Sequence, residues 1–301
     1  MRRFFVAVAK TLAYVIGVWI AARVVAVPIK MQVGRLRDLE LGVQIALIGL
    51  FVAAGVALVN SLMVWVGKSN LIKAGWPPPR AGLRGFGFGA LLGLAMCAGM
   101  LLLTLVTGGA RFTLTEGDLA AYLLRIFPLL GCLLLASLGE ELLFRGYPLT
   151  VFAHALGRGW ANLLLAVLFS AAHAAESGFN GLIALNIVVG SLTVGAIRFT
   201  SGGIPAAWGF HFAWNGLQVL AGSTLSGEDY GVPLVRLVND GPAVFSGAAF
   251  GPEGGLGATF ATVIMLVFLA RYFRRRGLAD LPVPFARSRP LERSELVPPP
   301  A

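Results

Sequence analysis

The chain has 301 residues, of which 57% are hydrophobic and only 13% are charged. Soluble domains carry about 25% charged residues, so this composition excludes an ordinary soluble domain and indicates a polytopic membrane protein. The two cysteines, Cys97 and Cys132, lie inside apolar runs, which supports neither a disulfide framework nor a cysteine metal site. The net charge of +10 would suggest nucleic acid for a soluble protein. Here most Lys and Arg residues fall between or after apolar runs, so we interpret them as topology signals and expect no nucleic-acid partner.

The apolar runs predict about eight membrane-spanning helices. The first run follows Met1-Arg2-Arg3 and continues to about Pro28. It is longer than the roughly 7–15 residues of a signal-peptide core, so we expect a retained first span. Further spans of roughly 20 residues are predicted at about 41–66, 86–108, 119–145, 160–175, 181–199, 204–222 and 255–272. The predicted fold class is an all-α, polytopic helical bundle embedded in a lipid bilayer.

Charges between the spans predict the orientation of the bundle. With Met1 in the cytoplasm, the inner side holds most of the basic residues, including the cluster Arg274, Arg275 and Arg276. The outer loops dilute their basic residues with Asp and Glu, although the first outer loop carries three basic residues. The positive-inside rule therefore predicts a multi-pass protein of the cell membrane with both termini cytoplasmic.

Glycines recur every four residues in the third predicted span, at Gly85, Gly89 and Gly93, with Gly99 further on. A stripe of small residues on one helix face allows another helix to approach closely. We therefore expect this span to pack tightly against a neighbour.

Two adjacent acids, Glu140 and Glu141, end a long apolar run in the fourth predicted span. An acid at the centre of a membrane helix costs roughly 2.5–3.5 kcal/mol, so such residues usually face a cavity and carry function. Glu141 and Arg145 are four residues apart and can pair on one helix face as structural support. Glu140 points about 100° away and has no obvious partner nearby in the sequence, which makes it the functional candidate.

Two of the three histidines, His173 and His211, also lie in apolar spans. His211 shares a helix face with Asn215, one turn later. At a rise of 1.5 Å per residue, Glu140, His173 and His211 come out within the depth of one cavity. The third histidine, His154, lies in a polar connection and is expected at the surface.

These residues form three patterns in order along the chain: Glu140-Glu141-x-x-x-Arg145, Phe169-x-x-x-His173 and His211-x-x-x-Asn215. The set resembles the signature of the CPBP intramembrane proteases, which include the type II CAAX prenyl endopeptidases and bacteriocin-processing or immunity-linked proteins. The resemblance covers roughly residues 118–222. It implies hydrolysis of a peptide bond near the membrane, in a peptide or protein substrate that is lipidated in some members.

The resemblance also implies the roles of the four residues. Glu140 and His173 would activate a water molecule, and His211 and Asn215 would stabilise the oxyanion or, in another version, help to bind a metal. Glu140, His173 and His211 could equally hold Zn²⁺ with an open position for water. However, the chain has no His-Glu-x-x-His helix, so we favour catalysis without a metal and leave zinc as the alternative.

The spans and patterns together divide the chain into four predicted regions. Residues 1–115 form N-terminal transmembrane helices, and 116–224 form the catalytic core. Residues 225–276 form an outer loop and the last span, and the Pro- and Arg-rich stretch 277–301 is expected to be a disordered cytoplasmic tail.

Two functions of other classes compete with the protease. A transporter or proton relay also uses buried Glu and His, but it would typically show internal repeats, and none is visible here. A non-catalytic immunity or scaffold protein of the same fold would be favoured by a broken set of patterns, and this set is complete.

Overall fold

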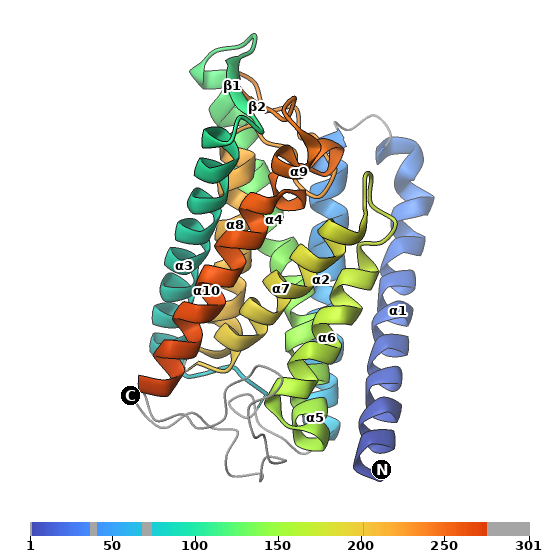
Figure 1. Ribbon diagram of the computed structural model, residues 1–301. Helices are drawn as coiled ribbons and strands as arrows, with labels where there is room; N and C mark the ends of the chain where they lie inside the picture. Colours follow the sequence, from blue (N-terminus) through green and yellow to red (C-terminus); the bar gives the residue numbers. More distant parts are fainter. Residues whose placement is uncertain (1, 37–40, 68–73, 201, 276–301) are drawn as a thin grey trace.

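The computed structural model describes residues 2–36, 41–67, 74–200 and 202–275, with side chains described outside 22–52 and 274. These residues form an all-α bundle with one small sheet (Figure 1). The predicted tail, 277–301, lies outside the described residues. The sheet lies at one end of the bundle, here called the sheet end. The beginning of the first helix and the end of the last helix lie at the opposite end, here called the termini end (Figure 1).

The predicted spans agree with the helices of the structure, with a few differences in their bounds. The eight helices that correspond to them are α1 (Arg2–Leu36), α2 (Leu41–Val66), α3 (Pro79–Val106), α4 (Leu119–Arg145), α6 (Arg158–Ala172), α7 (Gly181–Arg198), α8 (Gly203–Leu220) and α10 (Leu256–Arg275). Helix α3 begins at Pro79 rather than near residue 86. A proline fits the first turn of a helix, where its missing N–H costs nothing. A short helix that was not predicted, α5 (Tyr147–Leu156), follows α4 directly.

Five described helical stretches are long and apolar enough to cross a membrane. They are Arg2–Ala21, Pro79–Val106, Leu119–Leu156, Gly181–Arg198 and Leu256–Phe273. Two further apolar stretches, Ala53–Val66 and Arg158–Ala172, are shorter. The all-α membrane bundle is therefore confirmed, whereas the count of eight spans stays a prediction.

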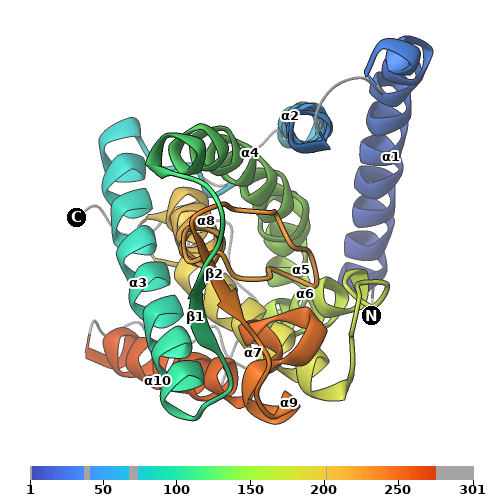
Figure 2. The same cartoon turned by 90° about the horizontal axis from the view of Figure 1, so that it is seen from above.

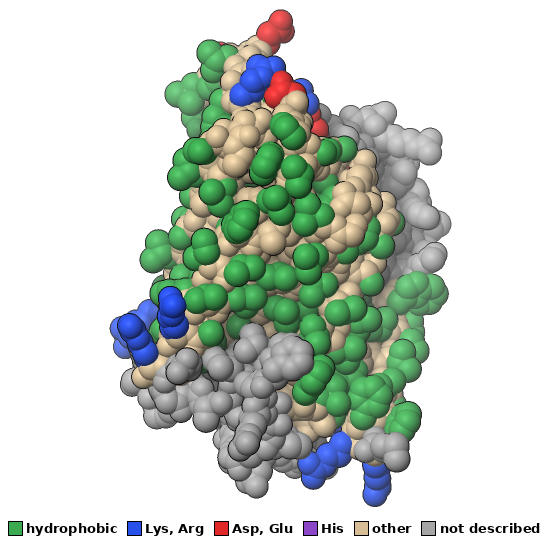
Figure 3. All heavy atoms as spheres, in the orientation of Figure 1, with side chains coloured by type: hydrophobic (Ala, Val, Ile, Leu, Met, Phe, Trp, Pro, Cys, Tyr) green, Lys and Arg blue, Asp and Glu red, His purple; other side chains and the backbone are tan. Residues whose placement is uncertain are grey.

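The surface has the distribution of side chains that a bilayer requires. On the face shown in Figure 3, hydrophobic side chains cover the middle of the molecule. Lys and Arg occur at both ends of that face, whereas Asp and Glu are visible only at the sheet end. An apolar band between two polar ends matches the hydrocarbon core and its two interfaces.

The glycine stripe of α3 packs against α8, as predicted for three of its four members. A Cβ atom added to Gly89 would lie 1.8 Å from the carbonyl oxygen of Ala206, and one on Gly93 would lie 2.3 Å from that of Phe210. Gly85 meets Gly202 in the same way. Gly99 was wrongly included, because an added Cβ there meets open space. This close contact fixes the α8 backbone on the side facing α3.

The sheet end contains more regular structure than the expected outer loop. Strand β1 (Arg111–Leu114) precedes α4, and β2 (Val235–Val238) pairs with it antiparallel, Arg111 opposite Val238. A short helix α9 (Ala243–Ser246) and two 3-10 turns, η1 (Ala248–Phe250) and η2 (Pro252–Gly254), lead into α10. Viewed from this end, the segment between α8 and α10 lies over the helices α4, α7 and α8 (Figure 2).

Candidate active site

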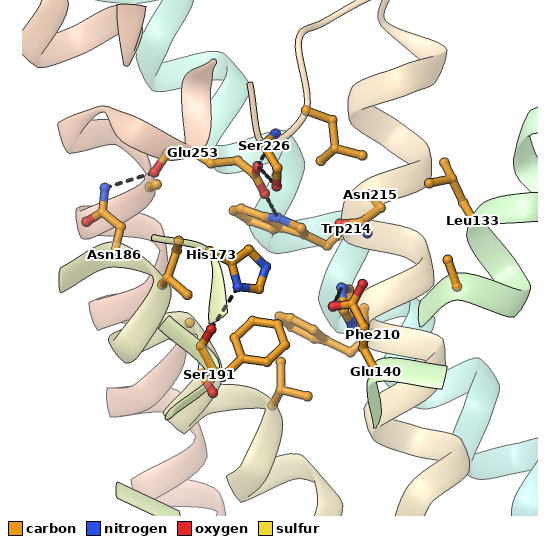
Figure 4. A pocket seen from close by; sticks show the side chains of 18 of the residues that line it. Leu133, Glu140, His173, Asn186, Ser191, Phe210, Trp214, Asn215, Ser226 and Glu253 are labelled. Carbon is orange, nitrogen blue, oxygen red and sulfur yellow. Dashed lines mark hydrogen bonds and ion pairs between the residues drawn. The ribbon is translucent and has the colours of Figure 1, made fainter. Parts of the chain in front are cut away.

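A cavity of about 340 Å³ lies inside the bundle, and all four residues proposed for catalysis line it. Glu140 comes from α4, His173 from the end of α6, and His211 and Asn215 from α8 (Figure 4). Helices α3, α7 and α10 and the segment after α8 complete the wall. His154 does not line the cavity; it is half-buried on α5, where its Nδ1 contacts the carbonyl of Thr150 at 2.7 Å.

Glu141 is the most buried of the acids in the cavity, with 0% of its side chain exposed. The predicted pair is present, with Arg145 Nη1 3.2 Å from Glu141 Oε1. Arg145 also donates to Ser191 Oγ at 2.6 Å and lies over the ring of Phe169 at 4.5 Å. A buried carboxylate needs such a partner, because an unpaired one would be strongly destabilising.

Glu141 has a second partner that its spacing in the sequence does not reveal. His211 Nδ1 lies 2.9 Å from Glu141 Oε1. With the carboxylate as acceptor, the proton is assigned to Nδ1. The other ring nitrogen, Nε2, is then left for the cavity. Glu141 thus links the Arg145 pair to the orientation of His211.

Glu140 is the acid that faces the cavity. Its side chain is 40% exposed, and its Oε2 lies 3.8 Å from His211 Nε2. That distance is too long for a direct hydrogen bond, and the two groups form an ion pair only when His211 is protonated. The titratable partner of Glu140 in this pair is therefore far away in the sequence: it is His211, on helix α8.

His173 lies on the opposite wall of the cavity from Glu140 (Figure 4). It caps the C-terminus of α6, and its Nδ1 lies 2.7 Å from the carbonyl oxygen of Phe169. A carbonyl only accepts, so Nδ1 carries the proton and Nε2 keeps a lone pair. Nε2 lies 3.9 Å from Glu176 Oε1. A neutral His173 thus offers the cavity a proton acceptor.

Asn215 lies one turn after His211 on the same face of α8 and also lines the cavity. Its side-chain amide forms no hydrogen bond with the residues that the structure describes. A half-buried amide without such a partner can donate to a bound molecule. His211 and Asn215 therefore present their side chains on the same wall of the cavity.

The expected metal ligands do not form a preformed metal site. Within the described residues, no group of three His, Cys, Asp or Glu side chains is placed to hold a metal ion. Glu140 and His211 are close, whereas His173 lies across the cavity and contacts Glu176. His211 also uses one nitrogen for Glu141. The donor set as placed does not fit the compact tetrahedral geometry of zinc.

Several cavity residues were not identified from the sequence, and three of them are Glu176, Ser226 and Glu253. Glu176 follows His173 in the loop after α6, and Ser226 and Glu253 come from the segment between α8 and α10. Glu176 lies outside the helices, and burial, followed by the nearby charges of Glu253, Glu140 and Glu228, raises its pKa from 4.5 to about 8. Each of these residues lies in a loop or a single 3-10 turn whose path depends on the fold, so neither spacing nor periodicity could have placed it at the cavity.

Comparison with known proteins gives one match. Residues 122–217, just under a third of the chain, match the family model described as Type II CAAX prenyl endopeptidase Rce1-like. The segment contains Glu140, Glu141, Arg145, His173, His211 and Asn215, so the resemblance seen in the three patterns is confirmed. The chain has no match among curated proteins or solved structures.

Proposed function

We propose that this chain is an intramembrane endopeptidase that hydrolyses a peptide bond with a water molecule activated in the cavity. The observation that carries the proposal is the convergence of Glu140, His173, His211 and Asn215, from three helices, on one cavity inside a membrane bundle. The match of this segment to a protease family supports the same reaction.

In the proposed first step, Glu140 accepts a proton from water while the water oxygen attacks the peptide carbonyl carbon. Glu140 suits this role because its carboxylate is exposed to the cavity and makes no direct hydrogen bond with the described residues. The lone pair on His173 Nε2 orients the water from the opposite wall or shares its proton. A positioned acid–base group typically contributes 10²–10⁴-fold to the rate.

In the proposed mechanism, His211 and Asn215 donate hydrogen bonds that stabilise the negative charge forming on the carbonyl oxygen. His211 Nδ1 is held by Glu141, and a proton on Nε2, beside the Glu140 carboxylate, makes that nitrogen a donor toward the cavity. Asn215 supplies an amide N–H from the next turn. The intermediate collapses when the peptide C–N bond breaks and the leaving amine takes the proton from Glu140, which yields a carboxylate and an amine.

The proposed mechanism uses no metal, and the separation of His173 from Glu140 across the cavity supports this choice (Figure 4). In the proposed mechanism, Asn215 separates the two versions of the chemistry. An amide is a poor zinc ligand but a good oxyanion donor.

The proposed substrate is a peptide or protein, lipidated in keeping with the name of the matched family. The proposed location is the cell membrane with both termini in the cytoplasm, supported by the basic side chains without neighbouring acids near the termini end of the face in Figure 3. Reporter fusions after Arg276 and Asp229 test this orientation. A signal from outside the cell after Arg276 would overturn it.

The reaction can be tested with purified protein in lipid vesicles and a farnesylated peptide that ends in a CAAX box. We expect cleavage next to the prenylated cysteine, with one ¹⁸O atom from labelled water in the new carboxylate. The same peptide without the lipid measures whether prenylation is required. If folded protein in the vesicles cleaves neither the farnesylated nor the unlipidated peptide, the result would argue against the protease function.

A further inference from the structure

Glu253 lies on η2 at the sheet end of the cavity (Figure 4). Its carboxylate accepts four hydrogen bonds. Its Oε1 accepts from Trp214 Nε1 at 2.5 Å and Gln218 Nε2 at 3.1 Å, both on α8. Its Oε2 accepts from the backbone N–H of Ser226 at 3.0 Å and from Ser226 Oγ at 3.2 Å. A carboxylate is an acceptor at both oxygens, so it matches this set of donors.

The backbone around Glu253 is tied to the other side of the cavity. The buried Asn186 side chain on α7 donates to the carbonyl oxygens of Glu253 at 2.9 Å and Gly255 at 3.0 Å. Asn186 in turn accepts from Thr259 Oγ1 on α10 at 2.6 Å. Glu253 therefore links α8 and the segment after it to α7 and α10.

The stretch Leu225–Glu228, here called the rim turn, is joined to this link through Ser226. Leu225, Ser226 and Glu228 line the cavity. Ser226 has φ +50°, a conformation that residues other than glycine seldom adopt. Besides the bonds to Glu253, the rim turn is held by Gly227 N–H donating to the carbonyl of Phe250 at 3.0 Å.

We propose that Glu253 is a positioning residue that latches the rim turn onto α8, so that the rim turn forms a substrate-binding wall of the cavity. The proposal rests on the proposed protease function and adds a residue outside the matched segment 122–217. The latch acts on substrate binding rather than on the chemical step. His211 and Asn215 are held independently, by Glu141 and by the packing of α8 on α3.

Glu253→Gln tests the latch because it keeps the side-chain volume and replaces one acceptor oxygen with an NH₂ donor. That donor faces either the Trp214 and Gln218 donors or the Ser226 N–H. With the farnesylated CAAX peptide, we expect KM to rise roughly 10- to 150-fold, the range for loss of a hydrogen bond to a charged group. We expect kcat to change by less than about threefold.

Two further variants make the kinetic test specific. Asp240→Asn changes a carboxylate of the same segment that pairs with Arg111 at the surface, and it should leave KM and kcat unchanged. Ser226→Ala removes one of the four bonds and should raise KM by less. Combined with Glu253→Gln it should add little, because both changes cut one link. A fall in kcat at constant KM in Glu253→Gln, or the same KM change in Asp240→Asn, would overturn the latch.

A measurement without substrate separates the latch from the proposed function. Leu225, 4% exposed, is changed to Cys in a Cys132→Ser background, and the rate of maleimide labelling is measured. Glu253→Gln should speed labelling about tenfold, and Asp240→Asn should not. If the parent protein cleaves no peptide but this difference appears, the latch stands and the protease fails. If Glu253→Gln does not fold, Ser226→Ala must speed labelling, and an unchanged rate in the folded variant overturns the latch.

Discussion

The two ends of the cavity hold their carboxylates with different partners. Toward the termini end, Glu141 is fully buried and lies against two groups that can carry positive charge, Arg145 and His211. Toward the sheet end, Glu253 is half-buried and accepts hydrogen bonds from an indole, an amide, a hydroxyl and a backbone N–H. Charge balances charge at the first end, and neutral donors solvate the charge at the second.

The difference teaches which end can move. Removing one partner of a buried ion pair leaves an uncompensated charge, which the bundle cannot tolerate without large loss of stability. Removing one neutral donor from this half-buried carboxylate leaves three others, so the cost is smaller. The termini end is therefore suited to hold the catalytic geometry, and the sheet end to adjust to a substrate.

The largest expected effect tests the catalytic assignment at the termini end. Glu140→Gln removes the proton acceptor without removing volume and should lower kcat by roughly 10²–10⁴-fold. Cleavage of the farnesylated peptide measures it, with Glu116→Gln, an exposed glutamate before α4, as the control. Near-normal turnover in Glu140→Gln would show that another group is the base.

Asn215→Ala comes next and tests the oxyanion wall. Loss of one oxyanion donor typically costs about 10²–10³-fold in kcat, and substrate binding should survive. Metal content, measured on the same preparations, should not change, and a chelator should do little to the wild type. Stoichiometric zinc that is lost together with activity in His211→Ala, and that restores the chelated enzyme, would contradict this mechanism.

The third prediction compares a buried pair with a surface pair. Arg145→Met leaves Glu141 without its guanidinium partner and should destabilise the protein by about 3–5 kcal/mol. Arg236→Met breaks the pair between Arg236 and Asp229, two side chains that are each about half exposed. It should lower the free energy of unfolding by only about 0–1 kcal/mol. Denaturation in detergent measures both, and equal losses would show that burial does not set the difference.

The termini end was largely predictable because its residues obey helical spacing. Glu141 and Arg145 are one turn apart on α4, as are His211 and Asn215 on α8. Periodic spacing within a helix is readable from the sequence. The contact between Glu141 and His211 joins residues 70 positions apart, and no local rule gives such a pairing.

The sheet end was not predictable, because its residues do not follow helical spacing. Glu253 and Ser226 lie in a segment rich in glycine and turns, where the sequence gives no period to follow. There Glu253 counted only as one of several acids that dilute the charge of an outer loop. Its function as an acceptor depends on donors from α8, and their position follows from the packing of α8 on α3.

The smallest expected effect is the pH dependence of stability that Glu176 contributes at the sheet end. Its pKa is raised from 4.5 to about 8, first by burial and then by the charge of Glu253. The folded protein therefore binds a proton that the unfolded chain releases between these values. The stabilisation is present in full below about pH 4.5 and is lost as the pH rises to about 8.

Glu176→Gln should flatten this part of the curve of melting temperature against pH, since Gln does not titrate. Glu253→Gln should narrow the pH range over which this stabilisation is lost without abolishing it. It removes one neighbouring charge and leaves the burial of Glu176 unchanged. Identical slopes in wild type and Glu176→Gln would place the Glu176 carboxyl in contact with bulk water, and the sheet end of the cavity would then be open in the resting protein.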